Sequence, residues 1–285
     1  MTEVPEGYKL PEGGNELEIT IRLYRISQRT INDRFTSGGF YYKETGAGTV
    51  QLIAPPKGED KPTGKLVLEG EVTHNNKLYR VTTIGPNAFA YCYELTEVSV
   101  PDGVTAIEEN AFAYCDKLER VSLPDSLTII KDAAFNGCSK LDEVSLPDSL
   151  TIIGNKAFSG CSKLSCVEIP ASVEEMGEMA FSYTDLKRVT FKKPSSLSRI
   201  RNSSFEGCKN LENVELPDGV ERIENSAFAG SGLKDVTLEN LLLLSSIEGY
   251  AFNECGSLES IKLPGSVKSI GEDVYKRQVL SYNQP

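Results

Sequence analysis

The sequence predicts an α/β solenoid. This would be a right-handed coil in which each repeat adds one short parallel β-strand and a short helical or 3₁₀ turn, behind a β-rich N-terminal cap. The main observation is a phenylalanine that returns every 23 or 24 residues. A fixed period in this range is typical of proteins whose repeats each form one supersecondary unit. The anchor residues are Phe89, Phe112, Phe135, Phe158, Phe181, Phe205, Phe228 and Phe252.

Most repeats also contain the phrase L-x-x-V-x-L-P, whose first leucine follows the phenylalanine by six residues. In LERVSLP, Val121 and Leu123 alternate with Arg120 and Ser122, as in a half-buried strand. Proline ends that strand because it lacks a backbone donor. Alanine before the phenylalanine predicts the helical turn, and a second apolar phrase, V-x-x-I, leads into the next turn. Stacked turns would share one core, with parallel strands about 4.8 Å apart.

Two repeats, after Phe181 and Phe228, depart from this pattern in the same way. Each has one residue fewer before the leucine and two more beyond the strand. We expect Leu197 and Leu244 to take the inward place there, with small bulges in the convex wall and no domain break. The run Leu241–Leu243 exceeds what the core needs, so it either packs over the bulge or forms a small exposed patch.

The chain divides into four predicted segments. Residues 1–45 do not match the repeat, and ELEITIRLYRI within them alternates like a strand, which predicts a β-rich segment of unknown role. Residues 46–84 would supply cap strands and the entry to the repeats. Residues 85–275 hold about eight repeats, and 276–285 form a non-repeat tail. Tyr275 falls in the next phenylalanine position, but no polar capping repeat follows, which suggests truncation or an unrelated tail.

Composition excludes some functions. The 30 basic and 41 acidic residues give a net charge of −11, whereas non-specific nucleic-acid binding needs a basic face. No apolar run approaches the roughly 18 residues of a membrane helix. The N-terminal residues lack the basic start and apolar stretch of a secretory signal, so the chain either stays inside the cell or lacks its leader.

The combination of L-x-x-V-x-L-P with V-x-x-I-G-x-x-A-F-x-x-C resembles the BspA-type (treponemal) leucine-rich repeat over residues 81–275. The resemblance implies a leucine-rich-repeat coil that serves adhesion or protein binding at the surface of bacteria and some protists. It implies no catalytic residues and no cofactor. The preceding GKLVLEGEVTHNNKLYRVTTIG is similar to the family's usual entry, an edge strand or hairpin.

Six of the seven cysteines lie three residues after the anchor phenylalanine, and Thr184 and Ser231 take that place in the two irregular repeats. This spacing predicts a ladder of buried thiols, because free cysteine packs as a small hydrophobe. Disulfides between neighbouring turns and a metal site are the alternatives, although the C-x-x-C spacing of zinc sites is absent. Cys166 is expected outside as a surface thiol, since His74, the only histidine, lies before the first full repeat and could hardly serve as its base.

The strands of such a solenoid line its concave side, the usual binding surface. Two polar columns free of aromatic residues should point outward there. Solvated surface charge is one interpretation of them and ligand binding is the other, whereas no apolar pocket for a general acid and no calcium-binding phrase is evident. The candidate ligand-binding residues are Glu97, Arg120, Glu143, Glu168, Arg188, Lys192, Lys193, Glu215 and Asp235.

Basic residues gather in one stretch of this acidic chain. They either balance surface charge or form a patch for an acidic ligand, such as a sulfated glycan or an acidic protein segment. The members of this basic stretch are Lys187, Arg188, Lys192, Lys193, Arg199 and Arg201.

The sequence therefore predicts a non-enzymatic module that binds a protein or glycan ligand, of the extracellular matrix or another cell surface, through the concave strand face. A cell-surface or secreted location follows from the family resemblance, and the residues leave the oligomeric state open. The alternative is an intracellular or structural protein-interaction scaffold, which the free cysteines favour. An enzyme with its chemistry in residues 1–80 is disfavoured, because that segment has no nucleophile–base pair or phosphate loop.

Overall fold

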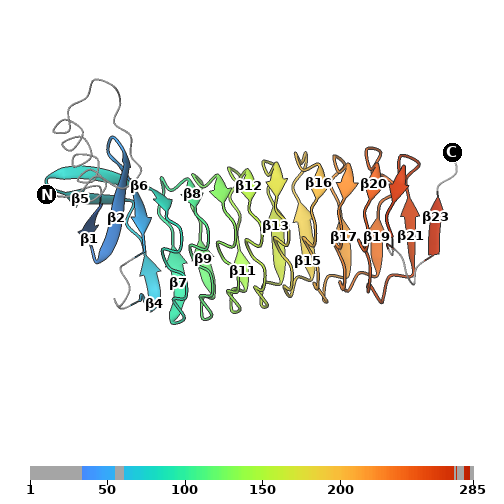
Figure 1. Cartoon of the computed structure of the whole chain (residues 1–285), viewed down its shortest axis with the longest axis horizontal. Helices are drawn as coiled ribbons and strands as arrows, with labels where there is room; N and C mark the ends of the chain where they lie inside the picture. Colours follow the sequence, from blue (N-terminus) through green and yellow to red (C-terminus); the bar gives the residue numbers. More distant parts are fainter. Residues whose placement is uncertain (1–33, 55–60, 273, 275–278, 283–285) are drawn as a thin grey trace, which may run out of the picture.

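The computed structural model of the chain describes residues 34–54, 61–272, 274 and 279–282. Over these residues the chain is an elongated stack of turns, with the first strands at one end and β23 (Val279–Tyr282) at the other (Figure 1). The predicted strand in ELEITIRLYRI and the predicted place of Tyr275 lie outside the described residues.

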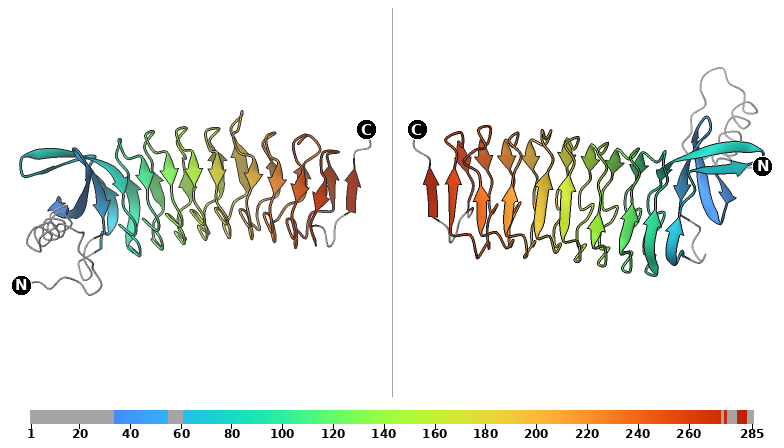
Figure 2. Two further views of the ribbon diagram at one scale, coloured as in Figure 1. Left: turned by 45° about the horizontal axis from the view of Figure 1, so that its top comes forward. Right: turned by 180° about the vertical axis from the view of Figure 1, so that it is seen from behind.

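Antiparallel strands form the N-terminal end of the stack (Figure 2). β1 (Arg34–Ser37), β2 (Phe40–Gly46) and β3 (Thr49–Ile53) form a meander, and β5 (Glu71–His74) and β6 (Lys77–Ile84) form a hairpin. β3 pairs in parallel with β6, which joins the meander to the sheet of the repeats. Phe40 meets Phe89 edge-on, with ring centroids 6.0 Å apart, so the meander also packs on the core.

One side of the stack is built from the L-x-x-V phrases. Each forms a strand, and except between β11 and β13 the strands of successive repeats pair in parallel in register, for example Glu97↔Arg120 and Val98↔Val121. We call the outward surface of these strands the leucine-side face. The strands are β4 (Gly64–Val67), β7 (Leu95–Ser99), β9 (Arg120–Ser122), β11 (Glu143–Val144), β13 (Cys166–Ile169), β15 (Arg188–Phe191), β17 (Asn213–Glu215), β19 (Asp235–Thr237) and β21 (Ser260–Leu263).

The V-x-x-I phrases form a second row of strands, so the prediction of one strand per repeat is wrong. Except between β14 and β16, two residues in each phrase pair in parallel with the next repeat, as Ile129 does with Ile152, and these pairs form a second ladder. We call the outward surface of these strands and β6 the isoleucine-side face. The strands are β8 (Ala106–Ile107), β10 (Ile129–Ile130), β12 (Ile152–Ile153), β14 (Glu175–Met176), β16 (Arg199–Ile200), β18 (Arg222–Ile223), β20 (Ser246–Ile247) and β22 (Ser269–Ile270).

The segment around each phenylalanine is a set of tight turns, and the described residues contain no helix. The prediction of short helical or 3₁₀ turns is therefore wrong for them. The residues two before and two after the ring adopt left-handed backbone, as with Ala133 (φ 56°) and Gly137 (φ 72°) around Phe135. The Phe135 N–H donates to the Ala157 carbonyl of the next repeat at 2.8 Å. Backbone donors that a helix would use internally thus link the repeats instead.

The eight phenylalanines are fully buried and form one continuous stack. Phe112 and Phe135 lie 5.3 Å apart between centroids with an interplanar angle of 5°, and Phe228 and Phe252 lie 5.5 Å apart at 1°. Alanine precedes the phenylalanine in every repeat except one, in which Ser204 takes its place. Ser204 is buried, and its hydroxyl donates to the Arg201 carbonyl at 2.8 Å. The predicted shared core is confirmed.

The irregular repeats keep the core intact. Leu197 and Leu244 are buried at the inward place, as predicted. β14 and β16 form no ladder beside the first insertion, whereas β18 and β20 stay paired beside the second. A further interruption, between β11 and β13, divides the leucine-side strands into two sheets. At the far end β23 pairs in parallel with β21, so part of the segment 276–285 extends this side of the stack.

Glycine after the phenylalanine makes room for a tyrosine of the preceding repeat. A Cβ atom on Gly137 would lie 2.6 Å from Cδ1 of the Tyr114 ring, whereas one on Gly160 would lie no closer than 3.6 Å to any atom, the nearest being Cα of Gly137. Both glycines have positive φ, 72° and 73° respectively. A substitution at Gly160 therefore measures the cost of backbone strain alone, whereas one at Gly137 adds the cost of displacing the Tyr114 ring.

We expect Gly160→Ala to lower the free energy of unfolding by roughly 1 kcal/mol, the cost of left-handed backbone in alanine. Gly137→Ala should cost about 1–2 kcal/mol more, because the Tyr114 ring must also move. Urea unfolding followed by circular dichroism measures both. In a Tyr114→Ala background the two substitutions should cost the same. Equal costs in the parent chain would contradict this account of the turn.

Candidate functional site

The predicted ligand-binding residues lie in columns on the leucine-side face. Lys65, Glu97, Arg120 and Glu143 are direct partners in successive strand pairs. Farther along, Arg188 pairs in register between Cys166 and Asn213, and Asn213 pairs with Asp235. Glu168 and Glu215 lie two residues farther along their strands, and Lys192 and Lys193 follow the end of β15.

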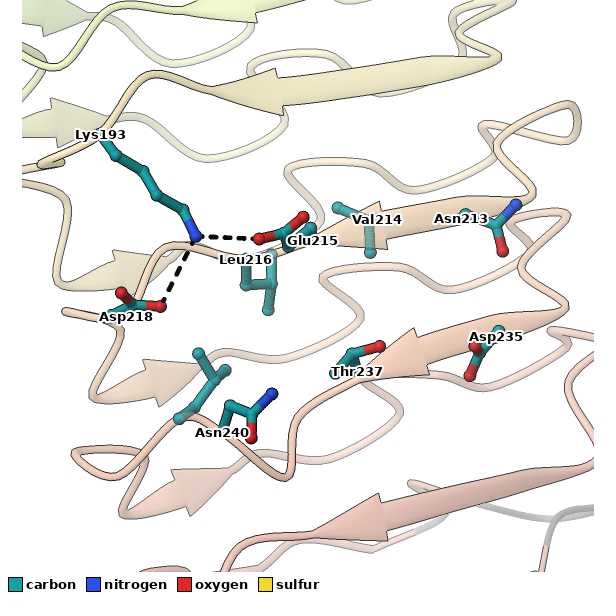
Figure 3. Close-up of a pocket in the computed structure, with 10 residues that line it drawn as sticks. Lys193, Asn213, Val214, Glu215, Leu216, Asp218, Asp235, Thr237 and Asn240 are labelled. Atoms are coloured by element: carbon teal, nitrogen blue, oxygen red, sulfur yellow. Dashed lines mark hydrogen bonds and ion pairs between the residues drawn. The ribbon is translucent and has the colours of Figure 1, made fainter.

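Three shallow hollows lie along this face. The first, about 420 Å³, spans β7 and β9 and reaches Lys65 and Glu143. The second, about 460 Å³, lies over the interruption between β11 and β13 and reaches Arg188 and Lys192. The third, about 340 Å³, lies between Lys193 and Asn240 (Figure 3). The hollows together contain all the predicted residues, so the structure brings them onto one surface but not into one enclosed site.

The lysines after β15 are held by carboxylates of neighbouring repeats. Lys192 Nζ lies 2.7 Å from Asp148 Oδ1 and 3.6 Å from Glu168 Oε2. The hydrogen bond to Asp148 raises the pKa of Lys192. Asp148 lies 44 residues before Lys192, in a turn two repeats away, and sequence analysis did not single it out.

Lys193 is held in a similar way, as Figure 3 shows: its Nζ lies 2.9 Å from Glu215 Oε1 and 3.9 Å from Asp218 Oδ1. The hydrogen bond between Lys193 and Glu215 raises the pKa of the lysine and lowers that of the carboxyl group. The side chains of Lys193 and Glu215 are 53% and 77% exposed, so their ion pair contributes little to the stability of the fold.

The basic stretch of the sequence does not form one patch. Arg188, Lys192 and Lys193 belong to the leucine-side face, whereas Arg199 begins β16 on the isoleucine-side face. Arg201 pairs with Glu175 at 2.8 Å beside a hollow of about 310 Å³ between β14 and β16. No motif of the sequence predicts this fourth hollow, because its position depends on the interruption of the ladder between β14 and β16.

Two exposed charges of opposite sign remain without an ion pair among the described residues of the second hollow. These are Glu143 and Arg188, which flank Cys166 on neighbouring strands. β13 lies between the strands of these two residues, and the ladder is interrupted between β11 and β13. Every other charged residue lining that hollow takes part in a salt bridge. The second hollow therefore offers one carboxylate and one guanidinium group to a partner.

The six repeat cysteines are buried and none forms a disulfide, which confirms the thiol ladder over disulfides. The Cys161 thiol donates to the Phe135 carbonyl of the preceding repeat at 3.2 Å, and Cys138 does the same to Phe112 at 3.1 Å. In the irregular repeats Thr184 contacts Cys208 Sγ and Ser231 contacts Cys255 Sγ, both at 3.2 Å. The thiols thus satisfy buried carbonyl groups as well as filling space.

Burial raises the pKa of Cys161 to about 12 and that of Cys208 to about 11, so these thiols stay protonated and unreactive. Cys166 is exposed, as predicted, and begins β13. His74 lies at the other end of the stack, in β5, where its ring stacks on Phe35 with centroids 4.3 Å apart. No three His, Cys, Asp or Glu side chains gather as metal ligands anywhere in the described part of the chain.

The run Leu241–Leu243 combines the two predicted alternatives, packing and exposure. Leu241 is buried at the irregular repeat, whereas Leu242 and Leu243 are 77% and 58% exposed. Within the described ranges, no helix is long and apolar enough to cross a membrane.

The fold and its repeated core define a solenoid protein of the leucine-rich-repeat class. A family model described as a BspA type leucine rich repeat region (6 copies) matches residues 82–196 and 190–283. This chain therefore belongs to the BspA-type leucine-rich repeat family. The repeat fold of this family is a typical scaffold for protein interaction. No curated protein matches the chain.

Solved structures of bacterial leucine-rich repeat proteins are similar to this chain. One from Bacteroides ovatus has a TM-score of 0.58 and 26% identity, over 85% of this chain and 80% of that one. The T. pallidum protein TpLRR has a TM-score of 0.52 and 24% identity, over 83% and 85%. The pneumococcal vaccine antigen PcpA has a TM-score of 0.51 and 22% identity, over 84% and 77%. The last two likenesses concern the fold alone.

The buried thiols make stability depend on alkaline pH. Thiols of an unfolded chain ionise near pH 8.5, whereas the folded pKa of Cys161 is about 12. A folded pKa above the unfolded value gives stability that is complete below about pH 8.5 and declines as pH rises toward the folded pKa. Each buried thiol should then cost about 1.4 kcal/mol per pH unit above the unfolded pKa.

The free energy of unfolding should fall in both chains as the pH rises from 8.5 to 9.5. We expect the decrease to be smaller in Cys161→Ser than in the parent chain, by on the order of 1 kcal/mol. The serine hydroxyl can still donate to Phe135, so the variant should fold at neutral pH. Urea melts at both pH values give the difference, and because both chains contain the same tyrosines their ionisation cancels. Parallel losses would show that Cys161 is not a protonated, buried thiol.

Proposed function

We propose that this chain is a non-enzymatic binding module that recognises a protein or glycan ligand through the leucine-side face. The observation that carries the proposal is the pair of exposed opposite charges, Glu143 and Arg188, in the hollow over β11, β13 and β15. Unpaired arginine on a surface lined by backbone and small side chains is a common anchor in protein recognition. Membership of a leucine-rich repeat family supports a binding role.

The ligand belongs to the extracellular matrix or to another cell surface, and the protein acts at the bacterial surface or after secretion. Support for this location comes from membership of the BspA-type family, because the resemblance to that family implies a role at bacterial surfaces. The hollows favour a polar ligand: Ser145, Thr190 and Glu168 line the second, and no aromatic ring lines any of the three on the leucine-side face.

An intracellular interaction scaffold is the second candidate. The observation that favours it is that no disulfide joins any of the seven cysteines, which suits a reducing compartment. Burial protects six of them from oxidation in either compartment, so their state is compatible with both locations.

A binding screen of the whole chain against immobilised matrix proteins and sulfated glycans, under reducing conditions, tests the proposal. Arg188→Glu should weaken binding at least about tenfold, because it replaces an anchor by a like charge beside Glu168. Arg222→Glu is the matched control, since Arg222 is equally charged and exposed but lies in β18 on the isoleucine-side face. Binding that is unchanged by Arg188→Glu, or weakened as much by Arg222→Glu, would overturn the assignment of the face.

A further inference from the structure

Charges alternate in sign along the first four strands of the leucine-side face. Lys65, Glu97, Arg120 and Glu143 lie on β4, β7, β9 and β11, and each is the direct register partner of the next. Equal register places them at equal spacing, about 4.8 Å from strand to strand. We call these four residues the charge row.

The charge row is accessible and only partly satisfied within the chain. Glu97 forms salt bridges with both of its neighbours in the row: its carboxylate oxygens lie 3.2 Å from Lys65 Nζ and 3.6 Å from Arg120 Nη1. The side chains of Lys65 and Arg120 are 64% and 70% exposed even so. Glu143 has no ion pair with any described residue, and its side chain lines the hollow of about 420 Å³ together with the rest of the row.

The column beside the charge row is small and uncharged. It consists of Val67, Ser99 and Ser122, on β4, β7 and β9, and of Ser145, which directly follows β11. Val67 is 63% exposed, which is unusual for a valine on a soluble surface but needs no partner by itself. No long or charged side chain in this column would hold a second flat surface away from the row.

A row with the signs plus, minus, plus, minus is complementary to its own reverse. We propose that this part of the leucine-side face binds a second copy of the chain, around a two-fold axis that runs parallel to the strands between β7 and β9. That axis places Glu97 opposite Arg120 of the second copy and Lys65 opposite Glu143 of the second copy. Each contact occurs twice, as an isologous interface requires. Val67 then meets Ser145, and Ser99 meets Ser122.

A two-fold axis placed farther along the face, through β13, does not have this property. An axis through β13 would place Glu168 opposite itself, and like charges in direct opposition are repulsive. Self-association at the charge row engages Glu143 with Lys65 of the second copy, but it leaves Arg188, on β15, at the edge of the dimer and open to another ligand. The inference rests on the proposed function in that both assign binding to the leucine-side face.

The contact covers four strands, a length of about 14 Å along the stack, so the dimer should be weak and sensitive to salt. Sedimentation velocity over a concentration series detects it. The whole chain should pass from monomer to dimer as its concentration rises, and higher salt should shift the transition to higher concentration. A chain that stays monomeric up to millimolar concentration at low salt would overturn the inference.

Charge-reversal variants distinguish this interface from non-specific association. Glu97→Arg alone and Arg120→Glu alone should each weaken self-association by about tenfold or more, because two contacts become repulsive. An equimolar mixture of the two variants should restore the dimer, since every contact between one variant and the other again joins opposite charges. Arg222→Glu on the isoleucine-side face should dimerise like the parent chain.

The outcomes also separate this inference from the proposed function. A mixture that fails to recover the dimer, or single reversals that leave it unchanged, overturns the interface at the charge row. Ligand binding that depends on Arg188 would survive that result. Conversely, recovery in the mixture would support the self-association even if no matrix protein or glycan bound the chain. Circular dichroism of each variant confirms that the comparison is made on folded protein.

Discussion

The structure depends on one constraint: each turn must bury its apolar side chains against the turns on either side. Phe135 has ring neighbours 5.3 Å away on both faces, Phe112 and Phe158, and no strand of a single repeat could cover it. Three rows of backbone hydrogen bonds maintain the required spacing, along the two strand ladders and the turns between them. Because the same positions meet in successive turns, the sequence must repeat wherever a side chain points inward.

That constraint explains which features were predictable from the sequence. Inward positions form identical pairs along the stack, so phenylalanine and cysteine recur and their burial follows from their period. Outward positions on the strands follow from alternation, which is why Glu97, Arg188 and Glu215 were placed on the correct side. Leu197 and Leu244 could be assigned because each restores the inward place after an insertion.

Other features had no local signal. The second strand has only two paired residues per repeat, too few to alternate visibly. Left-handed backbone occurs at Ala133, Lys156 and Met179, although residues of these types rarely adopt it and so do not predict it. The pairing of Lys192 with Asp148 joins residues two repeats apart, and the hollows depend on where ladders are interrupted. These features arise from stacking and are visible only once the turns are assembled.

The outward surface is free to vary because it lies outside the repeated core. One half of the leucine-side face carries alternating charges, and the other carries lysines bound by carboxylates around an unpaired arginine. The six repeat cysteines, by contrast, belong to the core and carry no chemistry for the site. The function of this chain therefore depends on outward side chains that vary from repeat to repeat. The repeated core fixes only the strands that carry them.

Excision of one whole repeat tests the account most directly. Removal of residues 139–161 joins Cys138 to Ser162 and regenerates the letters CSKL at the junction, one period of 23 residues shorter. We predict a folded, cooperatively unfolding chain with the circular dichroism of parallel strands, because every remaining turn still meets an equivalent turn. Removal of residues 150–161, about half a period, should unfold the stack beyond the cut. Equal damage from both deletions would contradict the claim that successive turns are interchangeable layers of one core.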